Sequence, residues 1–274
     1  MNDRHKTVLG EVFANPAMVR ELAKNDFKTK FAGSYLGVAW GFIQPVVTIL
    51  VYWFVFQVGL KQHDVAGAGG LTVPYVLWLI AGIIPWFFFS DALNSAANAL
   101  VQYSYLVKKV VFAIGTLPVI KVLSALFVHL FFMAFLVVAY ACCGLLPTLY
   151  TLQILYYTFA MLVLVLGLSY INCALVVFFR DWAQLVNIAL NVGIWITPIL
   201  WRMEAVNLPG WAEVLLKLNP MYYITAGYRD ALITHVYFWE RPGMTVYFWV
   251  LTLVFFLLGD LVFKRLRPHF ADVL

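Results

Sequence analysis

No charged side chain interrupts residues 122 to 179, which read VLSALFVHLFFMAFLVVAYACCGLLPTLYTLQILYYTFAMLVLVLGLSYINCALVVFF. One helix over these 58 residues would be about 87 Å long at 1.5 Å per residue. The hydrocarbon core of a bilayer is only about 30 Å thick, so a single crossing cannot hold the stretch. Gly144 and Pro147 disfavour helix. The segment is therefore expected to turn back near them and cross twice.

The composition of the whole chain excludes a soluble fold. Hydrophobic residues make up 64% of the 274 positions and charged residues only 11%, whereas soluble domains carry about 25% charged residues. Two further stretches lack charge, between Lys30 and Lys61 and between Asp181 and Arg202. A membrane β-barrel would instead show alternating segments of about 10 residues. We therefore expect an all-α integral membrane protein that forms a single transmembrane domain over residues 1–274.

The apolar stretches predict six crossings. They fall near residues 35 to 60, 73 to 101, 118 to 143, 151 to 179, 183 to 200 and 243 to 262. Pro45 is expected to kink the first crossing. Pro85 and Asp91 interrupt the second apolar stretch.

The distribution of Lys and Arg predicts that both termini are cytoplasmic. On this arrangement thirteen Lys and Arg residues lie on the inner side and five on the outer side, as the positive-inside rule requires. The first 34 residues also lack the apolar centre of a cleavable signal peptide. The predicted location is the plasma membrane, with several crossings.

The segment before the first crossing, residues 1 to 34, is expected to be cytoplasmic and interfacial. Residues 17 to 32 predict an amphipathic helix in the membrane interface. Its apolar face consists of Val19, Leu22, Ala23, Phe27 and Phe31, into which Asp26 and Lys30 intrude. Four cations at this entrance could attract an anionic lipid headgroup, or they could reflect the positive-inside bias alone; they are Arg20, Lys24, Lys28 and Lys30.

Residues 201 to 242, between the fifth and sixth crossings, predict two short helices. Trp211, Val214, Leu215 and Leu218 have the spacing of an amphipathic helix that Asn219-Pro220 ends. Neither helix is long enough to span, so one hypothesis is a re-entrant hairpin that acts as an outer gate. The alternative is a hairpin lying in the outer headgroups. The gate residues would be Trp211, Leu215, Leu218, Tyr222 and Tyr223.

Several kinds of chemistry are missing from the sequence. No GxxxxGK[ST] phosphate loop occurs, and the ionisable groups within the apolar stretches are too few to favour a proton-driven carrier. His129 is interpreted as a hydrogen-bonded structural residue. Cys142, Cys143 and Cys173 lack the paired spacing of a metal site and are interpreted as core residues. We expect no enzyme active site, no metal, no cofactor in this chain and no nucleic-acid partner.

Four segments together resemble the membrane permeases of ABC exporters for cell-surface glycopolymers. They are NDFKTKFAGSYLGVAWGFIQP at 25 to 45, YLVKKVVFAIGTLP at 105 to 118, FFRDWAQL with the following TPI at 178 to 199, and LNPMYYITAGYRDAL at 218 to 232. VYWFVFQVGL together with YLVKK is most similar to the teichoic-acid branch of bacterial permeases; O-antigen and capsule permeases are the related alternatives. A secondary transporter and a membrane enzyme are the competing classes.

The resemblance implies a homodimer of this chain bound to two copies of an ABC ATPase subunit, which would hold the ATP and Mg²⁺. It implies export of an undecaprenyl-diphosphate-linked polymer across a bacterial plasma membrane. Contacts with the ATPase would come from Tyr105, Lys108, Lys109, Phe112, Arg180 and Asp181. Aromatic residues of the first and fifth crossings would line the passage, namely Tyr35, Trp40, Trp53, Trp195 and Trp201. An interfacial aromatic belt is the alternative interpretation of these rings.

Overall fold

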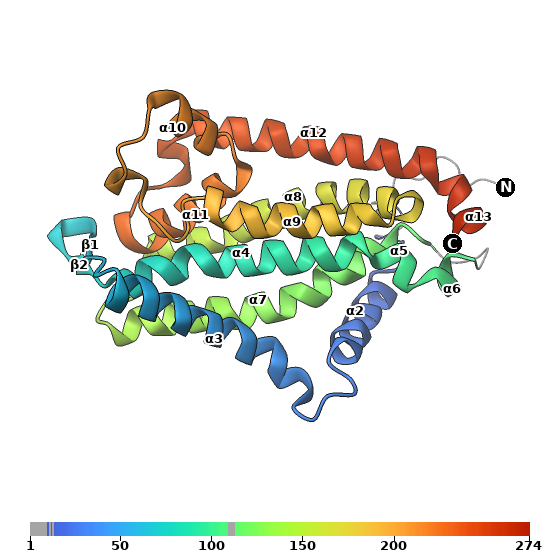
Figure 1. The fold of residues 1–274 in the computed structure, drawn as a ribbon, viewed down its shortest axis with the longest axis horizontal. Helices are drawn as coiled ribbons and strands as arrows, with labels where there is room; N and C mark the ends of the chain where they lie inside the picture. The colour runs from blue at the N-terminus through green and yellow to red at the C-terminus, as the bar shows by residue number, and fades with distance from the viewer. Residues whose placement is uncertain (1–9, 11, 13, 109–112) are drawn as a thin grey trace.

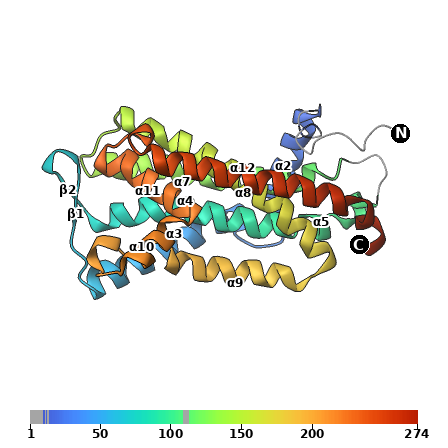
Figure 2. The same ribbon diagram turned by 90° about the horizontal axis from the view of Figure 1, so that it is seen from above.

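The protein is an elongated bundle of helices that run along its long axis (Figures 1 and 2). The computed structural model describes residues 10, 12, 14–108 and 113–274. Over this part of the chain nearly all regular structure is helical, and a two-stranded hairpin is the exception. The all-α integral membrane fold predicted from the sequence is therefore confirmed.

Within the described residues, five helical stretches are long and apolar enough to cross a membrane: Gly37–Gly59, Tyr75–Ala97, Thr116–Cys142, Leu149–Phe178 and Pro242–Val273. They contain α3 (Trp40–Trp53), α4 (Tyr75–Ala97), α7 (Thr116–Cys142), α8 (Gln153–Phe178) and α12 (Pro242–Leu266). The predicted fifth crossing corresponds to α9 (Asp181–Ile196), which has 16 residues. The six-crossing count remains a prediction.

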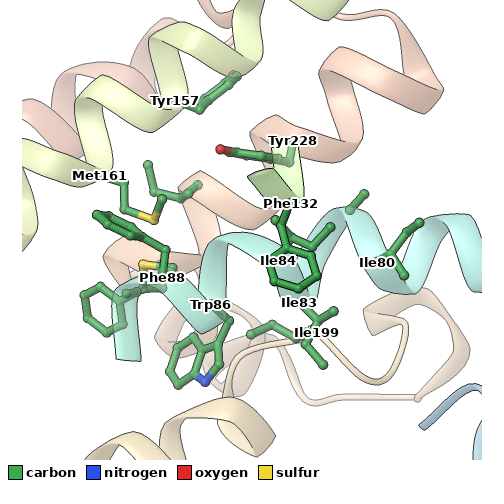
Figure 3. Packing of buried hydrophobic residues seen from close by; sticks show 14 of the residues in the cluster. Ile80, Ile83, Ile84, Trp86, Phe88, Phe132, Tyr157, Met161, Ile199 and Tyr228 are labelled. Atoms are coloured by element: carbon green, nitrogen blue, oxygen red, sulfur yellow. The ribbon is translucent and has the colours of Figure 1, made fainter. Parts of the chain in front are cut away.

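Helix α4 forms the centre of the bundle. In its most apolar stretch 78% of the residues are buried, against 6% for the stretch that contains α3. Pro85 and Asp91, which interrupt the apolar stretch in the sequence, both lie inside the continuous helix α4. Figure 3 shows side chains of α4, including Ile80, Ile84 and Phe88, packed in one buried cluster with Tyr228. The bundle is therefore organised around α4, and α3 lies at its edge.

Helices α8 and α12 approach each other closely because glycines face each other. A Cβ atom on Gly259 would lie 2.5 Å from the carbonyl oxygen of Gly167, and one on Gly167 would lie 2.9 Å from the backbone nitrogen of Phe256. Small residues permit this backbone contact in membrane helix pairs. The interface therefore depends on the absence of side chains at these two positions.

One end of the bundle carries the short elements that link the long helices. Strands β1 (Val65–Ala66) and β2 (Thr72–Val73) pair in an antiparallel hairpin between α3 and α4. Helices α10 (Gly210–Lys217) and α11 (Pro220–Arg229) lie at the same end (Figure 1). We call it the hairpin end. The remaining short turns there are η2 (Phe54–Gly59), η3 (Ala68–Gly70), η4 (Leu149–Leu152), η5 (Met203–Ala205), η6 (Asp230–Thr234) and η7 (Phe238–Glu240).

Helix α9 is shorter than the predicted crossing at residues 183 to 200 because the chain leaves the helix after Ile196. The backbone carbonyl groups that follow accept hydrogen bonds from Arg229 of α11. Its Nη1 donates to Pro198 O at 2.7 Å and its Nη2 to Ile199 O at 2.9 Å. Buried backbone groups need such partners. Arg229 therefore stabilises the non-helical connection.

The opposite end of the bundle, which we call the terminal end, carries the short helices near the chain termini (Figure 1). These are α2 (Pro16–Lys30), α5 (Ala99–Gln102), α6 (Ser104–Val107) and α13 (Phe270–Val273), with the turn η8 (Arg267–His269); the turn η1 (Gly37–Ala39) directly precedes α3. Helix α2 buries Val19, Ala23 and Asp26, and α7 is its main contact.

Substituting Gly259→Ala is expected to destabilise the protein by about 1–3 kcal/mol, because the added methyl group overpacks the α8–α12 interface. Thermal unfolding of the purified chain in detergent measures the effect. Gly243→Ala in the same helix is the matched control, since a Cβ there meets no atom within 4 Å. Equal unfolding temperatures for the two variants would refute the close-contact explanation.

Candidate transport site

A cavity of about 510 Å³ lies between α3, α4, α7 and α9. We call it the central cavity. Its polar lining includes Gln44 and Thr48 of α3, Ser90 and Asn94 of α4, and Asn191 of α9. Aromatic side chains, among them Tyr52, Trp86 and Trp195, complete the wall. Polar groups and aromatic faces together are typical of a site for a saccharide or another amphipathic ligand.

An ion pair joins two of the residues that line the central cavity. The Nζ of Lys30, in the last turn of α2, lies 2.6 and 2.7 Å from the two carboxylate oxygens of Asp91 in α4. Both side chains are partly exposed. The sequence predicted that Lys30 would interrupt the apolar face of α2, and the structure shows that Asp91 is its partner. Of the four cations predicted to attract a lipid headgroup, Lys30 is thus the one that lines the central cavity.

The wall formed by α7 contains His129, which is buried. Its Nε2 lies 3.1 Å from the hydroxyl group of Tyr228, which also bonds Thr158 at 2.6 Å. Its Nδ1 has no hydrogen-bond partner among the described residues. The hydrogen bond of Nε2 fits the structural role predicted for His129. The Nδ1 atom remains without a partner in the described part of the chain and belongs to a residue that lines the cavity.

The five aromatic residues predicted to line a passage occupy different environments. Trp195 lines the central cavity, and its carbonyl oxygen accepts a hydrogen bond of 2.8 Å from Trp201 Nε1. Tyr35, Trp40 and Trp53 are exposed and do not line this cavity. The structure therefore brings Trp195 and Trp201 together and leaves the other three apart from them.

Sequence reasoning missed most of the residues that line the central cavity. Gly41, Gln44, Pro45, Thr48 and Tyr52 have the spacing of one helix face, and all five line the cavity. Trp40 and Trp53 lie outside this face and do not line the cavity. The available signal was a pair of polar residues, Gln44 and Thr48, one helical turn apart in an otherwise apolar crossing.

The residues predicted to contact an ATPase lie at the terminal end, as far as they are described. Tyr105 in α6 and Lys108 after it are exposed. Arg180 and Asp181 form the exposed turn between α8 and α9, at the same end as α6 (Figure 1). Lys109 and Phe112 lie outside the described residues.

A buried cluster of side chains joins α2 to the α5–α6 segment, in which Tyr105 lies. One carboxylate oxygen of Asp26 accepts hydrogen bonds of 2.6 Å from both Tyr103 and Lys121. The side chains of Lys121 and Asp26 are only 11% and 5% exposed, so the pair is shielded from water. Burial and the adjacent Asp26 carboxylate raise the pKa of the Tyr103 phenol. Tyr103 therefore remains a donor, and α2, α7 and the α5–α6 segment are held together.

The other three predicted headgroup cations lie on the surface of α2. Arg20, Lys24 and Lys28 are exposed, and Lys24 pairs with Glu21 at 3.0 Å. None of the three lines the central cavity. Their position suits an interfacial helix, whose cations face the headgroups.

Helices α10 and α11, which correspond to the predicted helical hairpin, differ in burial. Trp211, Leu215 and Leu218, in or directly after α10, are exposed. In α11, by contrast, Tyr223 is buried and Tyr222 half-buried, and the Tyr223 hydroxyl lies 3.0 Å from those of Tyr156 and Thr245. Helix α11 packs against α4 and α8. Helix α11 is therefore part of the packed bundle, whereas the named α10 residues lie on its surface; the gate and the headgroup hairpin both stay predictions.

Two of the three cysteines differ from the sequence interpretation. Cys142 and Cys143, at the end of α7, are exposed, whereas Cys173 is buried. The prediction of core positions was wrong for the first two because α7 extends to the surface of the bundle there. In the part of the chain that the structure describes, no group of three or more His, Cys, Asp or Glu side chains could hold a metal ion.

Comparison with known proteins identifies the family. The model of the ABC-2 type transporter family matches residues 18–233. The chain belongs to this family. It is 25% identical over 263 residues to the O-antigen export system permease protein RfbA of Myxococcus xanthus, covering 96% of this chain and 97% of that protein. A protein of the same name from Klebsiella pneumoniae is 22% identical over 255 residues, with 92% and 93% coverage. The ABC-2 match therefore covers α2 from Met18 onward, α11 and every residue that lines the central cavity.

Substituting Lys121→Met is expected to destabilise this ABC-2 protein by about 3 kcal/mol or more, because it leaves Asp26 buried without its cation. The double variant Asp26→Asn/Lys121→Met should recover most of the loss. Unfolding in detergent measures both. Lys217→Met, which breaks the exposed pair with Glu213, is the control and should change stability by less than about 1 kcal/mol. Equal losses for Lys121→Met and Lys217→Met would contradict the buried-pair argument.

Proposed function

We propose that the chain is the membrane subunit of an ATP-driven exporter of a lipid-linked cell-surface polysaccharide. The supporting observation is the similarity to O-antigen export permeases over nearly the full length of both chains. A polymer of the O-antigen type is the substrate favoured by these relatives. The teichoic acid that the sequence resemblance put first is supported by no relative reported above and becomes the second candidate.

The energy for export is proposed to come from a separate ABC ATPase. The sequence contains no phosphate loop of its own, and membership of the ABC-2 family implies such a partner. Tyr105, Lys108, Arg180 and Asp181 are exposed at the terminal end and are the proposed contacts. The proposed orientation places this end in the cytoplasm, where most Lys and Arg residues lie. The hairpin end is then outside.

A second copy of the chain is proposed to cover the exposed faces of α3 and α9. On α3 the exposed apolar residues include Val47 and Leu50, and on α9 they include Leu185 and Ile188. The central cavity lies between the same two helices. Two copies facing each other there would enclose a passage from the two cavities, with α11 near its outer end as the proposed gate.

The Lys30–Asp91 ion pair is the proposed first contact for the lipid carrier. A diphosphate group carries more negative charge than a carboxylate and accepts stronger charge-assisted hydrogen bonds. It could therefore displace Asp91 from Lys30, because a partly exposed pair contributes little stability of its own. This exchange would bring the headgroup to the central cavity.

ATP-dependent transfer of a lipid-linked polysaccharide across the membrane tests the proposal directly. The chain is reconstituted with the ATPase from its own genome into vesicles, and polymer exposed to an external glycosidase is measured. O-antigen-type polymer should be transferred at least tenfold faster than a poly(glycerol phosphate) polymer on the same lipid. The reverse preference would establish the teichoic-acid alternative. No transfer of either polymer would reject the exporter function.

Substituting Trp195→Ala is expected to reduce substrate-stimulated ATP hydrolysis by about tenfold, because an aromatic face in the cavity wall is lost. Phe159→Ala on α8 is the matched control, since its ring is 58% exposed against 55% for Trp195 and does not line the central cavity. The control should retain nearly full hydrolysis. Similar effects of both substitutions would mean that Trp195 acts only as a surface ring.

A further inference from the structure

A second cavity of about 510 Å³ lies at the hairpin end, between the α9–α10 connection and α11. We call it the hairpin cavity. Three arginines and two acidic residues line it, namely Arg202, Arg229, Arg241, Glu204 and Asp230. None of these five residues lines the central cavity. The two cavities are therefore separate sites.

The arginines of the hairpin cavity differ in how their charges are compensated. Arg241 pairs with Asp230, with nitrogen–oxygen distances of 3.0 and 3.1 Å. Arg229 bonds only neutral carbonyl oxygens, those of Trp78, Pro198 and Ile199. Its positive charge therefore has no carboxylate at ion-pair distance among the described residues.

Arg202 has fewer partners still. Its Nε is buried and has no hydrogen-bond partner in the described part of the chain. Glu204 lines the same cavity, yet no ion pair joins it to any of the three arginines. A buried nitrogen–hydrogen donor without an acceptor costs about 1–3 kcal/mol. A bound acceptor would remove this cost.

We propose that the hairpin cavity binds the phosphate or carboxylate group of a hydroxylated ligand, with Arg202 as the residue that holds the anion. Two of its three arginines lack a carboxylate partner, so the charge of the site favours an anion. A guanidinium group matches both phosphate and carboxylate in geometry. The volume exceeds that of a lone phosphate ion, and the Tyr222 ring in the wall suits a sugar or glycerol group beside the anion.

The same chemistry could come from two sources. One is an acidic or phosphorylated saccharide of the exported polymer, and this assignment rests on the proposed function and on the hairpin end lying outside. The other is the glycerol phosphate headgroup of an anionic lipid. Both present an anion next to hydroxyl groups, and the experiment separates them.

Isothermal titration of the purified full-length chain in neutral detergent tests the site without ATP or transport. Glucose 1-phosphate is the probe, and glucose is its uncharged counterpart. Glucose 1-phosphate should bind saturably and glucose should not. Arg202→Gln should weaken binding about tenfold or more, the loss expected for one charge-assisted hydrogen bond. Lys61→Gln, which removes an exposed cation from the same end, should leave the affinity within twofold.

Glu204→Gln provides a test of opposite sign that does not depend on the Arg202 variant folding normally. Removing this exposed carboxylate from the cavity should tighten binding of glucose 1-phosphate severalfold. Weaker binding by this variant, equal binding of glucose and glucose 1-phosphate, or an unchanged affinity of a folded Arg202→Gln variant would each overturn the proposal. Absence of binding by the unaltered chain would also overturn it.

Competition by lipid assigns the source. If phosphatidylglycerol displaces glucose 1-phosphate and phosphatidylcholine does not, the anion site accepts a lipid headgroup. If neither lipid competes, the site is reserved for a saccharide anion. Both outcomes support an anion site at Arg202. Because binding is measured without transport, a failure of the exporter function would leave this result unaffected.

Discussion

The side chain of Arg229 holds together the elements at the hairpin end. It donates to carbonyl groups of α4 and of the connection after α9, and its guanidinium carbon lies 3.5 Å from the centre of the Trp78 ring. Backbone groups away from water must find partners within the protein. Because Arg229 provides them, α9 can end early and α11 can lie buried against α4 and α8.

Three consequences follow from that arrangement. The chain that leaves α9 after Ile196 brings Trp201 back to the last turn of the helix, where its Nε1 donates to the carbonyl oxygen of Trp195 in the wall of the central cavity. The buried α11 brings the Tyr228 hydroxyl to His129 and Thr158. The connection after α9 also leaves space for the hairpin cavity, in which Arg202 lies beside Arg229. Arg229 itself lines the hairpin cavity, and the carbonyl groups that it binds belong to the connection that forms one wall of that cavity.

Ion pairs have the corresponding role at the terminal end. Asp26 and Lys30 both come from the face of α2 that the sequence described as apolar, and each meets a residue of opposite charge from a long helix. The Asp26–Lys121 pair is buried and joins α2 to the α5–α6 segment through Tyr103. The Lys30–Asp91 pair is partly exposed beside the central cavity. The first pair is thus shielded from water, whereas the second is accessible to it.

Composition and the gaps between charges were enough to predict the membrane class, the long helices and the turn near Gly144 and Pro147, because uncharged apolar stretches of this length are buried in hydrocarbon. The sequence also located α2, α10 and α11 through helical spacing and the Asn219-Pro220 boundary. The pairing of the charges, the end of α9 at Ile196, and the cavity that Gln44 and Thr48 line and that Trp40 and Trp53 do not became visible in the folded chain alone. These features depend on contacts between residues 30 to 151 positions apart, such as Lys30 with Asp91 and Arg229 with Trp78. Local patterns carry no information about such contacts, because the partner is selected by packing.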